Sequence, residues 1–121
     1  MEGHNRETIL KLNLKRLLSG NSYDDFLVVS SGEYYVQFTN EASANSDLLY
    51  CEVVSSFSIP GLISEYQASR IQVLGFEAPT PNTKESDGGS PNFTRSFDVS
   101  SDRLLSGLAH TASIIFNDIF A

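Results

Sequence analysis

Apolar residues recur at two different spacings along the chain, and each spacing predicts one kind of element. Spacings of three and four residues, typical of a helix with one apolar side, occur in three segments. These predicted helices cover about residues 5–18, residues 65–74, and a last segment from 100–102 to at least 119. Alternating or short continuous apolar runs, typical of strands, occur in four other segments. These predicted strands cover residues 26–30, 33–39, 47–55 and 92–99.

Turn and cap residues mark the boundaries of these elements. Ser31-Gly32 is a two-residue turn signal between the first two strands. Ser64 and Gln67 have the spacing of a capping box, and Gly75 fits the end of that helix. The segment 78–91 contains prolines and glycines among polar residues, which predicts a long mobile loop.

The order of the elements predicts the fold class. Three successive strands with short connections favour an antiparallel meander, and at least one later strand extends it. The order is helix, three strands, helix, strand, helix. We therefore expect one α+β domain over residues 1–121, with an antiparallel sheet packed against three helices.

Composition and charge exclude several classes of function. The chain has 15 acidic and 8 basic residues and a formal net charge of -7, which argues against nucleic-acid and anionic-membrane partners. It has no run of 18 apolar residues that could cross a membrane. Charged residues interrupt the first 20 positions, so we expect no signal peptide and a cytoplasmic location.

Few residues offer catalytic or metal-binding chemistry. Cys51 is the only cysteine, and it alternates with apolar neighbours, so we interpret it as a core residue. The two histidines are His4, near the N-terminus, and His110, on the last predicted helix, where a boundary position explains it. The nucleophile elbow, the phosphate loop and the zinc-binding helix motif are absent. We expect no catalytic residue, no metal site and no cofactor.

Four short motifs in a fixed order resemble one family. They are Tyr34-Tyr35-Val36-Gln37-Phe38, Cys51-Glu52-Val53-Val54-Ser55, Leu74-Gly75-Phe76 followed by Pro79, and Asn92-Phe93-Thr94-Arg95. In this order they resemble the YbjN-like branch of the type III secretion chaperone superfamily, over residues 10–121. Phe76 stands where that family more often has tryptophan. The chain also has one strand between its second and third helices, where secretion chaperones commonly have two.

The resemblance implies a fold and a broad role. Secretion chaperones of this fold are small, acidic, cytosolic and often dimeric, and they hold an extended client segment against apolar patches on sheet and helices. By this resemblance we expect a polypeptide partner and a homodimer. Fold alone does not establish function.

Two sets of residues are candidates for binding a peptide. The first comprises the polar residues inside the family-like motifs, which either orient a peptide backbone or satisfy neighbouring loops. They are Gln37, Glu52, Asn92 and Arg95, of which Glu52 and Arg95 could pair across the sheet. The second comprises apolar residues on the strand faces opposite the predicted core, which would form an open patch. They are Tyr35, Leu48, Tyr50 and Val54. An edge strand could also add a client strand by backbone pairing.

Three classes of function follow from these observations. The first is a non-enzymatic peptide-binding module, chaperone-like or an adaptor. The second is a dedicated inhibitor or immunity-type protein that blocks one partner. The third is an enzyme or small-ligand binder that uses the 79–91 segment as a lid, and the residue inventory favours it least.

Overall fold

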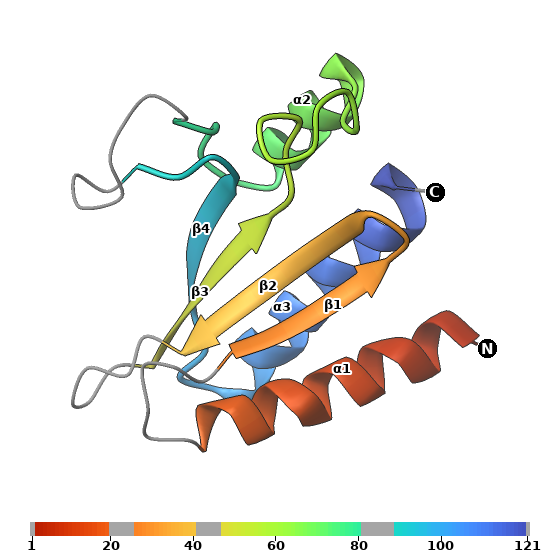
Figure 1. Cartoon of the computed structure of the whole chain (residues 1–121). Coiled ribbons are helices and arrows are strands. Elements are labelled where there is room, and N and C mark those ends of the chain that lie inside the picture. The colour runs from red at the N-terminus through yellow and green to blue at the C-terminus, as the bar shows by residue number, and fades with distance from the viewer. Residues whose placement is uncertain (1, 20–25, 41–46, 81–88, 121) are drawn as a thin grey trace.

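The chain builds a four-stranded sheet and three helices in the predicted order (Figure 1). The computed structural model describes residues 2–19, 26–40, 47–80 and 89–120. The helices are α1 (Glu2–Leu18), α2 (Glu65–Val73) and α3 (Asp102–Ile114), and a π-helical turn, η2 (Ile115–Ile119), extends α3. The strands are β1 (Phe26–Ser31), β2 (Tyr34–Asn40), β3 (Leu48–Val53) and β4 (Phe93–Asp98). The predicted α+β class is confirmed. Of the predicted loop 78–91, residues 81–88 lie outside the described part.

All strand pairs are antiparallel, and the order in the sheet, β1-β2-β3-β4, follows the order in the chain. Gly32, with φ of 62°, makes the tight turn between β1 and β2 that the sequence predicted. Val36 lies opposite Val53, which in turn lies opposite Phe93. This register places the apolar residues of neighbouring strands on one face of the sheet.

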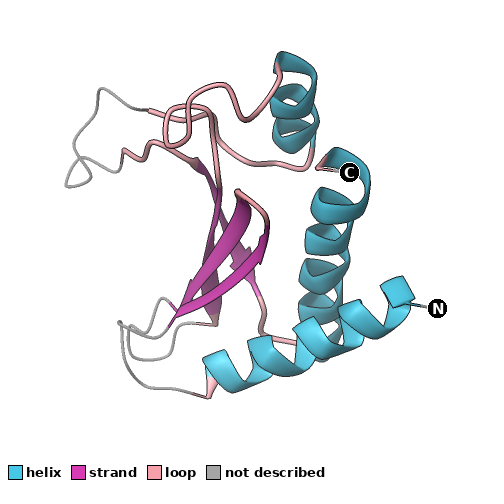
Figure 2. Cartoon of the chain, turned by 45° about the vertical axis from the view of Figure 1, so that its right-hand side comes forward, coloured by secondary structure: helices cyan, strands magenta, loops and turns pink. Residues whose placement is uncertain are grey.

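The helices cover that apolar face. Figure 2 shows α1 and α3 on the same side of the sheet, and none of the described helices lies over the opposite side. The strands contribute buried Val36, Phe38, Leu49, Cys51, Val53, Phe93 and Phe97 to the core. The helices contribute buried Leu14, Leu17, Ile71, Leu105, Leu108, Ala109, Ala112, Ile115 and Ile119. The predicted apolar stripes of the first and last helices therefore contribute to the core.

The predicted capping box of α2 is present. The Ser64 hydroxyl accepts from the Gln67 N–H at 3.1 Å, and the Gln67 side chain accepts from the Ser64 N–H at 2.8 Å. Two of the orphan N–H groups at this helix start are thus satisfied. Gly75 follows the helix with φ of 94°, in the left-handed region expected of a helix-ending glycine.

The last helix does not continue as a regular α-helix to its end. Its final turn is π-helical, and two side chains of α2 bond to its carbonyl groups. Gln67 Nε2 donates to the Ile119 carbonyl at 2.9 Å, and Arg70 Nη1 donates to the Asp118 carbonyl at 3.1 Å. These tertiary bonds stabilise a helix end that the sequence pattern does not distinguish from a regular one.

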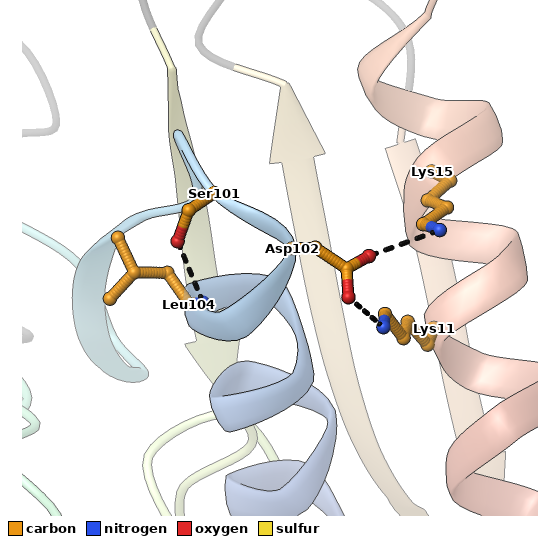
Figure 3. A network of polar contacts seen from close by, with 5 residues as sticks. All are labelled: Lys11, Lys15, Ser101, Asp102 and Leu104. Carbon is orange, nitrogen blue, oxygen red and sulfur yellow. Dashed lines mark hydrogen bonds and ion pairs between the residues drawn. The ribbon is translucent and has the colours of Figure 1, made fainter.

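The first turn of α3 is tied to α1 by a cluster of polar contacts (Figure 3). Ser101 caps α3, and its hydroxyl accepts from the Leu104 N–H at 3.1 Å. Asp102 contacts Lys11 Nζ at 2.7 Å and Lys15 Nζ at 3.1 Å. Hydrogen bonds from these two lysines, Lys11 first, hold the pKa of Asp102 below its usual value.

None of the helices in the described part of the chain combines the length and the apolar character needed to cross a bilayer.

Candidate functional site

An apolar groove of about 480 Å³ lies between α1, β1 and the α3–η2 helix. Its apolar lining comes from all three elements: Ile9, Leu10, Leu27, Val29, Ala109, Ala112, Phe116 and Phe120. Polar side chains also line the groove: Arg6, Glu7, Asn13, Ser30, Ser31, Ser113 and Asn117. An apolar lining interrupted by polar groups is the composition typical of a binding site.

The groove exists because the two halves of α1 pack differently. Leu14 and Leu17, in its second half, are buried in the core. Ile9, in its first half, borders the groove and is 59% exposed. On the α3 side, the small residues Ala109 and Ala112 leave space that larger side chains would fill.

Aromatic rings form one part of the groove wall. Phe120 stacks on Tyr34 of β2 with ring centroids 4.4 Å apart, and it meets Phe116 edge-on at 5.7 Å. These ring contacts join this part of the groove wall to β2.

One polar contact bridges α1 and α3 beside the groove. His110 Nδ1 lies 2.8 Å from Glu7 Oε1. His110 itself is exposed. His4 lies within α1, but its side chain is outside the described part.

The predicted apolar patch on the opposite sheet face is only partly present. Leu48 is 38% exposed, whereas Tyr35 and Tyr50 are half-buried. Val54 is completely buried, so its assignment to an exposed patch is wrong. The chain turns directly after Val54, with the N–H groups of Ser58 and Ile59 both donating to the Ser55 carbonyl.

Two of the four polar candidates, Glu52 and Asn92, belong to one hydrogen-bond network. Glu52 Oε1 accepts from the Ser90 hydroxyl at 2.9 Å, and that hydroxyl accepts from the Asn92 N–H at 3.1 Å. Asn92 Nδ2 donates to the Tyr35 hydroxyl at 3.3 Å, and Asn92 Oδ1 accepts from the Ser55 N–H at 3.2 Å. Asn92 is buried, and its amide therefore joins the segment before β4 to the end of β3. This arrangement supports the structural interpretation of these residues.

The other two polar candidates lie apart from that network. Gln37 lies opposite Glu52 in the register, and its amide donates to the Thr39 hydroxyl at 3.5 Å. Arg95 lies opposite Cys51 on the helix-covered face, with its guanidinium 4.3 Å from the Phe97 ring centroid, and it donates to the Leu74 carbonyl. Because Glu52 lies opposite Thr94 instead, a Glu52–Arg95 pair across the sheet does not form.

Cys51 is buried, as its alternation with apolar residues predicted. Burial raises the pKa of its thiol, the negative charge of Glu52 raises it further, and Arg95 partly opposes both. In the described part of the chain, His, Cys, Asp and Glu side chains form no group of three or more suited to a metal ion.

The groove residues were not among the candidates that the sequence indicated. Two features of the sequence could have identified them. Four consecutive apolar residues, 26–29, leave β1 apolar on both faces. The stripe of the last helix also widens at Ile114 and Phe116, so that it has more apolar surface than one sheet face can cover.

Comparisons with protein-family models, with curated proteins and with solved structures give no match to this chain.

Proposed function

We propose that the chain is a non-enzymatic module that binds an apolar segment of another polypeptide in the groove between α1, β1 and α3. The observation that carries this proposal is the groove itself. Its volume of about 480 Å³ falls in the ~300–1,000 Å³ range of small-ligand sites, and aliphatic and aromatic side chains form most of its lining. Such a surface gains free energy by removing apolar side chains of a client from water.

The polar lining and the overall charge define the client further. Arg6, Asn13 and Asn117 offer hydrogen-bonding groups along the groove, which suit the peptide groups of a bound backbone. The net charge of -7 favours a client with basic residues beside its apolar segment. The resemblance of the motifs to secretion chaperones supports the same class of role.

The groove is a better candidate than the opposite sheet face. The middle of that face carries Gln37, Thr39 and Glu52, and Val54 is buried. A client with apolar side chains would have to desolvate those polar groups there, whereas the groove presents aliphatic and aromatic side chains.

A blocking substitution tests the proposal. Ser113 is half-buried on α3 and lines the groove, so Ser113→Trp should fill it. The probe is a fluorescein-labelled peptide, Lys-Lys-Phe-Leu-Val-Val-Phe-Lys-Lys, and the readout is fluorescence anisotropy. We expect binding to the wild-type protein and at least tenfold weaker binding to Ser113→Trp. The matched control is Ser106→Trp, since Ser106 is also half-buried on α3 but does not line the groove.

Two results would contradict the proposal. One is equal affinity of both tryptophan variants and the wild type, and the other is no binding to the wild type at all. Amide chemical-shift mapping gives an independent check. Shifts caused by the peptide should cluster at groove residues such as Leu10, Val29 and Phe116. A panel of peptides with different apolar cores would separate a general peptide holder, which binds several, from a dedicated inhibitor.

A further inference from the structure

The two edges of the sheet differ in how they are protected. Beyond β4, Glu77 pairs with Thr94, with N–H to carbonyl distances of 2.8 and 3.3 Å. β4 also carries the charged residues Arg95 and Asp98, which discourage another strand from pairing there. β1 has neither protection, because none of its six residues is charged and β2 is its only strand partner among the described residues.

β1 is also apolar on both of its faces. Leu27 and Val29 line the groove on the helix side. On the other side, Phe26 is 62% exposed and Val28 is 46% exposed. An exposed apolar edge strand is a template for pairing with another strand.

The alternating direction of the backbone N–H and carbonyl groups shows which groups of β1 point away from β2, toward the outer edge of the sheet. The Val54 N–H donates to the Tyr35 carbonyl at 3.1 Å, so Tyr35 turns its backbone groups toward β3. Ser30 lies opposite Tyr35 and therefore turns its own groups away from β2. Backbone N–H and carbonyl groups point to alternate sides at successive residues of a strand, so those of Phe26 and Val28 also point away from β2. The N–H and carbonyl groups of Phe26, Val28 and Ser30 thus form the outer edge.

We propose that a second copy of the chain pairs its β1 antiparallel to this edge, about a twofold axis at Val28. In this register Val28 lies opposite Val28 of the partner and Phe26 lies opposite Ser30. All three outward-facing residues then exchange backbone hydrogen bonds, and the two sheets join into one of eight strands. Each copy contributes the same surface, the outer edge of β1, as a twofold interface requires.

The helix layer offers a second contact across the same axis. Lys11 and Lys15 reach Asp102 from one side of α1, whereas Ile9 borders the groove from the other side, next to β1. Ile9 is therefore placed toward the β1 edge, and with Leu12, also exposed, it leaves apolar surface on α1. Two copies joined at β1 would bring their α1 helices alongside each other at this surface.

The residues of β1 favour a second copy as the strand partner. β1 is uncharged, so self-pairing places no like charges opposite each other at the axis, whereas the net charge of -7 on each chain opposes association and limits its strength. One short strand and part of one helix give an interface near the small end of the known range. We therefore expect a weak dimer, with association visible at roughly 10–1,000 µM.

Sedimentation velocity over that concentration range tests the proposal. The wild-type protein should shift from monomer to dimer. Val28→Lys, which places two like charges opposite each other at the axis, should weaken association at least tenfold. The matched control is Val73→Lys, since Val73 is 83% exposed on α2 and away from β1. A wild type that is monomeric throughout, or a Val28→Lys variant that associates like the wild type, would overturn the proposal.

Cross-linking tests the register without weakening the interface. Val28→Cys should form a disulfide-linked dimer with oxidised glutathione, because residues at the axis lie directly opposite each other. Val73→Cys should not, and Cys51 is buried in both variants. Equal cross-linking of the two variants would contradict the register. These tests need no peptide, so their outcome is independent of the client site proposed above, although Ile9 borders both surfaces.

Discussion

At the scale of single residues, Cys51 illustrates how burial determines reactivity. Its side chain lies between Phe38 and Arg95 in the sheet register, on the helix-covered face. Only the thiolate form of cysteine reacts as a nucleophile, and burial raises the pKa of this thiol. The folded protein therefore holds Cys51 as an unreactive thiol.

We predict that Ellman's reagent leaves the native protein unmodified at pH 8 and labels one thiol per chain in urea. The labelling rate should rise with the unfolded fraction, because unfolding removes both the pKa shift and the steric protection. A free cysteine in the same buffer is the control. Labelling of the native protein at the rate of that control would show that Cys51 is accessible.

The alternation of apolar and polar residues predicted which face of the sheet a side chain lies on better than it predicted which residue lies opposite on the next strand. It placed Arg95 on the same strand face as Phe93 and Phe97, and the structure confirms this. It did not provide the register between β3 and β4, because no short turn connects them. The sequence therefore allowed a pair between Glu52 and Arg95, although the register places them on opposite faces. Val54 was misassigned because its burial depends on where the chain leaves the strand.

At the scale of elements, the end of α2 depends on one glycine. Gly75 has φ of 94°, and a Cβ there would lie 2.9 Å from Arg95 Nη1. Arg95 would have to move away from the Leu74 carbonyl that it contacts. A side chain at this position would therefore strain the backbone and displace Arg95 from its contact with Leu74.

We predict that Gly75→Ala lowers the free energy of unfolding by about 1 kcal/mol or more, measured by urea denaturation. The matched control is Gly107→Ala. Gly107 lies inside α3, and an added Cβ there would contact nothing within 4 Å. That substitution should raise stability by about 1 kcal/mol through helix propensity. Equal effects of the two substitutions would refute this account.

The number, type and order of the elements could be predicted from the sequence, because most carry a one-sided apolar pattern and several begin or end at a recognisable cap or turn. The groove could not be predicted from the sequence, because it depends on the distance between the first half of α1 and β1. The small residues Ala109 and Ala112 do not reveal that distance. The π-helical turn escaped prediction because contacts from α2 stabilise it.

At the scale of the whole molecule, Asp102 and its two lysines link the first helix to the last. The folded pKa of Asp102 is depressed, so its contribution to stability is present above the unfolded value of about 4. That contribution is lost as the pH falls through the folded pKa. We predict that Asp102→Asn lowers the urea midpoint at pH 7 and that this difference disappears at strongly acidic pH.

High salt provides the control for that prediction. Asp102 is exposed, so 1 M NaCl should reduce the difference between variant and wild type at pH 7 by screening. A difference that is independent of both pH and salt would mean that Asp102 acts through helix capping geometry rather than charge.

The agreement between strand order and chain order has a consequence for the rate of folding. The β1–β2 hairpin closes over a very short loop, whereas the contact between Lys11 and Asp102 joins residues 91 positions apart. Closing a longer loop costs more entropy, so we expect the meander to form before α1 docks on α3. The Asp102→Asn variant should then refold in stopped-flow experiments as fast as the wild type but unfold faster. The contact between the first and last helices would thus lengthen the lifetime of the native protein without changing how quickly it forms.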